Sequence, residues 1–407
     1  MSKQGQSVRK RRVFYIPGYD PFHPRRYREL YRKESTAQSA ISGYEIGQKP
    51  KQGKGPYGWH VSALIDGCDV ESEFEVLYWA DMVKSSMNMG IAATYGVLAH
   101  TAWIYISSGA LWRLMRLRKG PVIAALYPVG FLLVQALLAW LAAYGIAQGA
   151  QMLASGTIGV VIGWALGAIV AYGILDFFRR KDNKFFAYYL MHDYAYSART
   201  KGANPPELEA RMAEFTKRIS DALKSDVDEV LVIGHSSGAH IGVSVLADLL
   251  RAQALQDDGP ELSFLTLGQV VPMVSFLPQA WRLRADLAFM AGQERPFWVD
   301  VTAPGDGCAF ALCDPVSVSG VAPEGKQHPL VFSAAFTQSL SSERWAELRW
   351  RFFRLHFQYL CAFDAPKDYD YFQITAGPLT LRERYVARPP SKSRIETPVN
   401  RFVSTAP

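Results

Sequence analysis

The stretch Val230-Leu-Val-Ile-Gly-His-Ser-Ser-Gly-Ala-His240 decides how the rest of the chain is interpreted. Its first four residues are apolar and predict a buried strand, and an apolar segment with helical spacing follows from Ile241. Between them, Ser236 is flanked by Gly234 and Gly238. Small residues on both sides permit a tight strand-to-helix turn that holds the serine hydroxyl clear of the sheet. The stretch therefore predicts an exposed serine at the end of a strand.

The sequence Gly-His-Ser-Ser-Gly at 234–238 resembles the Gly-His-Ser-x-Gly turn of lipases and esterases in the α/β-hydrolase superfamily. The resemblance implies an α/β fold with a mostly parallel sheet and a triad in the chain order serine, acid, histidine, with Ser236 as the nucleophile. It extends loosely over residues 13–80 and 185–370, and only the turn is specific. The alternative is a structural glycine-rich turn in a Rossmann-like sheet.

The acid and the base of such a triad have candidates further along the chain. Asp306 lies in a loop after the predicted strand 297–302 and resembles the acid of the family, with Asp314 as the alternative. His356 begins a His-x-x-Tyr sequence that resembles the end of several lipases, with His328 as the alternative base. Because a serine hydroxyl is a poor nucleophile, a histidine must accept its proton and a carboxylate must orient that histidine.

The oxyanion of an acyl-transfer reaction needs two N–H donors. The resemblance implies one donor from the loop after an early strand, which Gly18-Tyr19 matches by position, and one from Ser237, which follows the nucleophile. Pro17 stands where the family often has histidine. The alternative for residues 17–20 is an ordinary Pro-Gly turn. We expect Tyr19 and Ser237 to supply the two donors.

The stretch from Pro121 to Leu175 contains no Asp, Glu, Lys or Arg. It predicts two transmembrane helices, about 121–147 and 152–177, joined by an uncharged loop. Basic residues stand before the first helix and after the second, so the positive-inside rule puts both ends in the cytoplasm. The alternative is a pair of buried helices in a soluble core. The chain is therefore expected to be an integral protein of the inner or plasma membrane.

Residues 87–112 are also free of formal charge. A third complete crossing would put the Tyr19 loop and Ser236 on opposite sides of the membrane, so that one sheet could not contain both. We therefore expect this stretch to form an interfacial or re-entrant helix.

Charge and cysteine content narrow the possible partners. Residues 1–60 have a net charge of +9 within a chain of net charge +7. A basic arm beside apolar spans favours contact with anionic membrane lipids, and no nucleic-acid recognition motif accompanies it. The cysteines have neither a disulfide-rich nor a metal-binding spacing: Cys68, Cys308, Cys313 and Cys361. We expect no metal and no organic cofactor.

The predicted organisation is an α/β-hydrolase-like domain interrupted by a membrane insertion. Residues 1–84 and 179–380 form the two parts of the domain, 85–178 the insertion, and 381–407 a tail. Strands are expected at 13–16, 74–79, 263–267 and 297–302, and residues 21–60 are expected to be a solvated loop with one short helix at 25–34. The expected activity is hydrolysis of an apolar acyl ester, lipid or lipid-like. The alternatives are a non-catalytic scaffold and an acyltransferase with the same triad.

Overall fold

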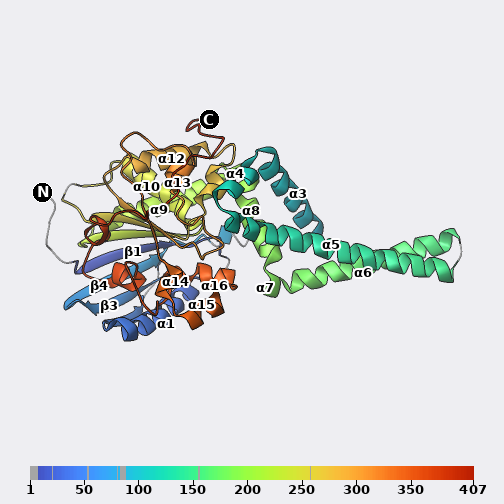
Figure 1. Ribbon diagram of the computed structural model, residues 1–407, viewed down its shortest axis with the longest axis horizontal. Coiled ribbons are helices and arrows are strands. Elements are labelled where there is room, and N and C mark those ends of the chain that lie inside the picture. Colours follow the sequence, from blue (N-terminus) through green and yellow to red (C-terminus); the bar gives the residue numbers. More distant parts are fainter. Residues whose placement is uncertain are drawn as a thin grey trace.

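A mixed, mostly parallel sheet of eight strands forms the centre of the protein (Figure 1). The computed structural model describes residues 8–20, 22–52, 55–79, 81–82, 89–154, 156–256 and 258–407. Within these residues the strand order is β2-β3-β4-β1-β5-β6-β7-β8. The strands are β1 (Lys10–Ile16), β2 (Glu45–Pro50), β3 (Gly58–Ile65), β4 (Cys68–Val76), β5 (Glu229–His235), β6 (Glu261–Leu267), β7 (Phe297–Thr302) and β8 (Leu330–Ser333). The α/β class and the mostly parallel sheet are confirmed.

Strand β1 lies in the middle of the sheet, parallel to β4 on one side and to β5 on the other. β5 to β8 continue as parallel neighbours. Only β3 runs against the rest, because Asp66 and Gly67, both at positive φ, form a tight turn that pairs β3 with β4 in an antiparallel hairpin. The loops that follow β1, β5, β6 and β7 therefore meet at one edge of the sheet, where ligands of open α/β sheets bind.

Helices cover both faces of the sheet (Figure 1). Alternate residues of each central strand point to opposite sides, so Val230 and Val232 join one core and Leu231 and Ile233 the other. Helices α9 (Pro206–Ala222), α10 (Gly238–Arg251) and α12 (Trp281–Ala291) pack on the first face. On the second face lie α1 (Arg25–Ser42), α14 (Phe336–Ser339), α15 (Ser342–Leu348), α16 (Phe352–His356), α17 (Tyr371–Ala376) and α18 (Leu381–Tyr385).

The segment between β4 and α9 forms a separate group of helices, from which two long helices project as a hairpin (Figure 1). It comprises α3 (Ile91–Ser107), α4 (Ala110–Leu117), α5 (Lys119–Leu153), α6 (Thr157–Arg180), α7 (Asp182–Phe185) and α8 (Ala187–Ala198). Among the described residues, α5 and α6 are the helices long and apolar enough to cross a membrane. Helix α5 includes the first predicted span, 121–147, and extends it at both ends, whereas α6 begins five residues after the predicted start of the second span, 152–177, and ends three residues beyond it. The predicted boundary at 84–85 and residues 1–7, the start of the predicted basic arm, lie outside the described residues.

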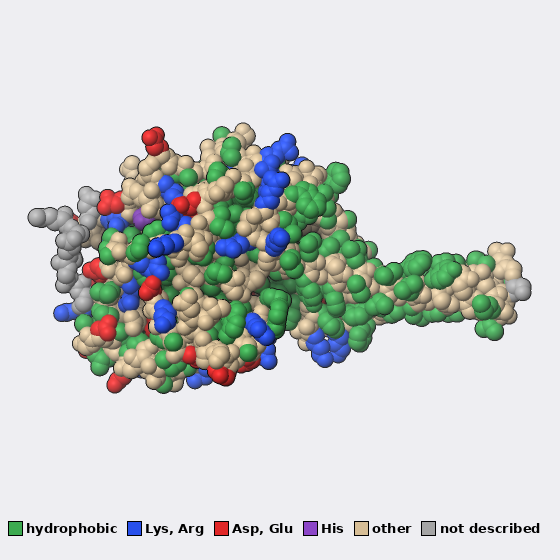
Figure 2. Space-filling model, in the orientation of Figure 1, with side chains coloured by type: hydrophobic (Ala, Val, Ile, Leu, Met, Phe, Trp, Pro, Cys, Tyr) green, Lys and Arg blue, Asp and Glu red, His purple; other side chains and the backbone are tan. Residues whose placement is uncertain are grey.

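Small residues hold the two hairpin helices together. Gly163 and Gly167 of α6 face α5 so closely that a Cβ on Gly163 would lie 2.9 Å from Ala147 Cα, and one on Gly167 would lie 2.7 Å from Ala143 O. Such close backbone approach is how apolar helices pack where no hydrophobic effect drives them together. The outward side chains of both helices are mainly apolar, as Figure 2 shows.

Helix α3 does not follow the hairpin outward. It packs against α8 and α5, where Leu98, Leu132 and Met191 form a small buried cluster. Gly109, at φ 74°, then turns the chain into α4, whose Leu114 is buried in the core on the first face of the sheet. The stretch that was expected to be interfacial thus lies along the base of the hairpin.

Residues 381–407, which were expected to be a tail, lie along the domain. After α18, Ile395 forms a parallel bridge with Cys313, and Arg284 donates from Nε to the carbonyl of Ser404 at 2.7 Å.

Candidate active site

Ser236 occupies the turn between β5 and α10 in a left-handed conformation, with φ 56°. This conformation is strained for a residue with a side chain, and strain of this kind is found at functional sites. The flanking glycines are required by space: a Cβ on Gly238 would lie 2.1 Å from Ile16 O, and one on Gly234 would lie 2.7 Å from Ala239 Cα. The Ser236 N–H donates to Leu267 O at 2.9 Å, which ties the turn to β6.

The loop after β1 lies directly against the serine. A Cβ on Gly18 would lie 2.9 Å from Ser236 Cβ and 3.3 Å from its Oγ. Tyr19, the next residue, and Ser237, at the start of α10, both line the same cavity as Ser236. The structure thus brings the two predicted oxyanion donors to the serine, at the end of a helix whose first N–H groups have no partner within the helix.

His356 and Asp306 are paired in the same place. His356 Nδ1 lies 2.7 Å from Asp306 Oδ2, although the two residues are 50 positions apart in the chain. Asp306 is buried, and its carboxylate also accepts from Tyr359 OH at 3.0 Å and from Cys308 N at 2.9 Å. The tyrosine of the His-x-x-Tyr sequence therefore helps to fix the acid.

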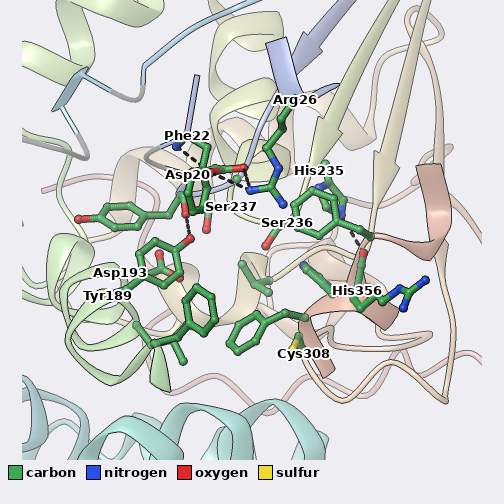
Figure 3. A pocket seen from close by; sticks show the side chains of 18 of the residues that line it. Asp20, Phe22, Arg26, Tyr189, Asp193, His235, Ser236, Ser237, Cys308 and His356 are labelled. Carbon is green, nitrogen blue, oxygen red and sulfur yellow. Dashed lines mark hydrogen bonds and ion pairs between the residues drawn. The ribbon is translucent and has the colours of Figure 1, made fainter. Parts of the chain in front are cut away.

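This pairing determines which imidazole nitrogen is available. A carboxylate only accepts hydrogen bonds, so Nδ1 of His356 carries the proton and Nε2 has a free lone pair. Nε2 is buried and has no hydrogen-bond partner among the described residues. In Figure 3 the side chains of Ser236 and His356 point toward one another. His356 is thus arranged as a base beside the serine.

His235, directly before the serine, fixes the backbone of His356. Its Nε2 lies 3.0 Å from the carbonyl of His356, so Nε2 carries the proton and Nδ1 accepts from Tyr15 OH at 3.2 Å. Burial, with the nearby His356, lowers the pKa of His235 to about 3, so the ring stays neutral and this hydrogen-bond pattern is kept. The sequence pattern placed His235 in the turn but did not reveal this bond.

The serine opens into a cavity of about 1150 Å³ between the sheet edge and the base of the hairpin (Figure 3). Its lining includes Tyr105 of α3, Pro121 of α5 and Phe186 after α7, so the group of helices between β4 and α9 forms part of the wall. Much of the remaining wall is apolar and includes Trp79, Leu190, Leu208, Val270, Met273 and Val274. The cavity is large enough for an extended apolar ligand.

The alternative acid and base lie elsewhere. Asp314 caps the short helix α13 (Pro315–Val318), accepting from Val316 N and Ser317 N at 3.0 Å, and forms an ion pair with Lys326. His328 directly precedes β8, so it lies at the amino end of the parallel sheet, opposite to the edge with Ser236. Neither residue lines the cavity.

Asp193 on α8 also lines the cavity, and no motif in the sequence had pointed to it. Burial raises the pKa of this carboxyl to about 7. The only sequence signal was an acidic residue in an otherwise aromatic segment, Tyr188 to Tyr196.

One group of potential metal ligands lies at the site within the described part of the chain. Atoms of Asp306, Cys308 and His356 lie within 4.8 Å of one another. The Asp306 and His356 atoms of this group already form the hydrogen bond described above, so the arrangement is accounted for without an ion. The expectation of no metal and no organic cofactor stays a prediction.

Comparison with protein-family models, curated proteins and solved structures finds no match for the chain. The functional assignment therefore depends on the geometry of the site.

Proposed function

We propose that this chain is a membrane-anchored serine hydrolase that cleaves acyl esters, built on an α/β-hydrolase type of domain. The observation that carries the proposal is the arrangement of three side chains, Ser236, His356 and Asp306. Ser236 is strained at a strand-to-helix turn, and Asp306 is buried and lies 2.7 Å from Nδ1 of His356. Nε2 of His356 has no partner among the described residues and lies in the cavity of the serine. The order serine, acid, histidine along the chain agrees with this class.

Each residue has a defined chemical role in such a reaction. Ser236 Oγ attacks the ester carbonyl while His356 Nε2 accepts its proton, and Asp306 stabilises the imidazolium that forms. Backbone N–H groups of Tyr19 and Ser237 stabilise the oxyanion, helped by the positive end of the α10 dipole. His356 then returns the proton to the leaving alcohol, and a water molecule hydrolyses the acyl-enzyme by the same route.

The position of the hairpin supports a membrane location. Its helices α5 and α6 project from the domain with mostly exposed apolar side chains, unlike core helices. Arg179, Arg180, Lys181 and Lys184 stand at its inner end, and the loop at 154–156 is uncharged. By the positive-inside rule, α5 and α6 cross the membrane and the catalytic domain lies in the cytoplasm. Tags at residue 1 and residue 407 on opposite membrane faces would contradict this topology.

The cavity supports an apolar acyl ester as the substrate. Its wall is largely apolar and is shared between the domain and the base of the hairpin, so a lipid-like acyl chain can reach Ser236 from the membrane side. Amide or thioester bonds would use the same residues, but an apolar ester fits the wall and the membrane location together.

Hydrolysis of p-nitrophenyl octanoate by the purified protein in detergent tests the proposal. Ser236→Ala is expected to abolish turnover above background, because the nucleophile is lost. Ser237→Ala is the matched control: it removes a neighbouring hydroxyl in the same cavity but keeps the backbone N–H, so turnover is expected to persist. Equal turnover by the Ser236→Ala variant and the parent protein would refute the proposal.

A further inference from the structure

A carboxyl group without a partner among the described residues lies in the same cavity as the proposed base. Asp193, on α8, is half-buried and lines the cavity with Ser236 and His356 (Figure 3). Among the described residues its carboxyl takes part in no hydrogen bond or ion pair. Asp20, which lines the same cavity, is different: it accepts from Tyr27 OH at 2.6 Å and from Arg26 Nη1 at 3.0 Å.

None of the described groups that surround Asp193 forms a hydrogen bond or an ion pair with it. Those near enough for its charge to affect them come from several elements: Tyr105 of α3, Tyr189 and Tyr194 of α8, Cys308 after β7, and His356 of α16. Two of the nearby hydroxyls are already used: Tyr105 OH donates to Met273 O at 2.9 Å, and Tyr189 OH donates to Tyr19 O. His356 Nδ1 is taken by Asp306.

An unpaired carboxyl in a largely apolar cavity is unfavourable for folding, because burial removes its hydration and the protein offers no hydrogen bond in return. Such groups are uncommon in folded proteins, and they cluster at sites where a ligand supplies the missing partner. A ligand hydroxyl that donates to Asp193 would remove the penalty.

The nearby base indicates which part of the ligand carries this hydroxyl. In the proposed reaction His356 returns a proton to the leaving alcohol, so the alcohol part of the ester lies beside the imidazole. Asp193 and His356 both line the cavity that contains Ser236, as Figure 3 shows. A hydroxyl on the alcohol part of an ester bound at Ser236 can therefore reach Asp193 across the cavity.

We infer that Asp193 is a specificity-determining residue that binds a free hydroxyl on the alcohol part of the ester, so that the enzyme selects acyl esters of diols or polyols over esters of simple alcohols. This inference rests on the proposed function. It adds a substrate class to that function: mono-esters in which the alcohol keeps at least one hydroxyl.

The test compares two esters of equal shape, 2-hydroxyethyl octanoate and propyl octanoate, which differ by a hydroxyl in place of a methyl group. Affinities are measured in the Ser236→Ala protein in detergent, so that binding is observed without turnover. We expect the hydroxyethyl ester to bind about 10-fold or more tightly, because a site built to bind a hydroxyl rejects the analogue that lacks it. Asp193→Leu in the same protein is expected to bring the ratio close to 1.

Two further variants separate this role from a structural one. In the protein with Asp193, the ratio of the two affinities is expected to rise between pH 6 and pH 8. Asp193→Asn keeps the shape of the side chain but cannot ionise, so in this variant the ratio should not change with pH. Glu347→Gln removes a carboxylate that lines the cavity rim but is paired with Arg354 at 2.9 Å, and it should keep both the ratio and its pH dependence.

Equal affinities for the two esters with Asp193 present would overturn the inference, as would an unchanged ratio in the Asp193→Leu protein or an unchanged pH dependence in the Asp193→Asn protein. These outcomes differ from failure of the proposed function, which would appear as turnover that does not depend on Ser236.

Discussion

The two ends of the parallel sheet differ in whether their buried polar groups have hydrogen-bond or ion-pair partners. At the amino end, Arg11 and Glu229 form a fully buried ion pair at 2.5 Å. Both side chains also form hydrogen bonds with other groups around them. At the carboxyl end, Ser236 is strained, His356 Nε2 has no partner among the described residues, and Asp193 is unpaired within that same set. The first end is arranged for stability, whereas the second retains groups that a substrate can use.

The amino end shows how complete the pairing can be. Glu229 Oε1 accepts from Ser263 Oγ at 2.6 Å and from Leu381 N at 2.8 Å, and Arg11 Nη1 donates to Gly377 O at 2.8 Å. These bonds join β1, β5 and β6 to the segment around α18. A buried charge pair with all its hydrogen bonds made does not require a ligand to explain it.

The largest effect is expected at the carboxyl end. His356→Ala should lower kcat for p-nitrophenyl octanoate by about a millionfold, because the proton acceptor for Ser236 is lost. His328→Asn changes a histidine at the opposite sheet end and should leave kcat per folded molecule within about 3-fold. Steady-state kinetics in detergent measures both. A loss of activity in His328→Asn as large as that in His356→Ala would break the contrast between the two ends.

A mutation at the amino end is expected to lower the stability of the protein rather than its activity. Glu229→Ala leaves Arg11 buried without its partner and should lower the free energy of unfolding by about 3–5 kcal/mol. The exposed pair of Lys10 and Asp226 offers a control, since Asp226→Ala breaks an ion pair that solvent already screens and should cost much less. Denaturant unfolding followed by tryptophan fluorescence provides the measurement. A strong loss of kcat in folded Glu229→Ala protein would contradict the assignment of this end to stability.

A smaller effect is expected where a paired group supports the site. Tyr359→Phe removes the hydrogen bond that Tyr359 OH donates to Asp306 and the one that it accepts from Ala303 N. The bond to Asp306 is worth about 1 kcal/mol, so kcat should fall by about 5- to 10-fold. Tyr385→Phe removes a similar bond, from Tyr385 OH to Asp368 O at 2.7 Å, outside the site and should keep kcat. Equal kinetics for the two variants would show that the tyrosine does not act through Asp306.

The last expected effect concerns stability and pH. In the folded chain the pKa of Asp193 is raised to about 7, against about 4 for an unfolded aspartate. Between these values the folded state keeps a proton that the unfolded state has released, so stability falls as the pH rises from about 4 to about 7. Asp193→Asn should therefore raise the melting temperature at pH 8 and change it little at pH 4. An equal shift at both pH values would contradict the raised pKa.

The sequence predicted the carboxyl end better than the rest of the sheet. The turn at Ser236 has fixed steric demands, and chain order then limited the acid and the base to a few residues, among which the structure brings Asp306 and His356 together. The expected strands at 13–16, 74–79, 263–267 and 297–302 fall on β1, β4, β6 and β7, although the second of them ends at Val76.

The prediction for residues 21–60 was wrong. Its Arg, Lys, Gly and Pro content suggested a solvated loop, but α1 continues to Ser42, and β2 and the first three residues of β3 follow. A signal was present: Trp59, Val61, Ala63 and Ile65 alternate with more polar residues, and these four are buried. Gly43, at φ 75°, likewise marks the end of α1.

Asp193 could not be found from the sequence. A carboxyl becomes notable only when its surroundings are known, because its lack of a partner depends on where α8 packs and on which neighbours have already used their hydroxyls. The bond from His235 to the carbonyl of His356 is hidden for the same reason, since it joins residues 121 positions apart.

The most direct test of the central claim is mass-spectrometric mapping of the adduct formed with a fluorophosphonate probe. We expect a single covalent adduct on Ser236, formed in the Ser237→Ala protein and lost in the Ser236→Ala and His356→Ala proteins. Absence of the adduct from well-folded protein, or an adduct on another residue that persists in Ser236→Ala, would contradict it.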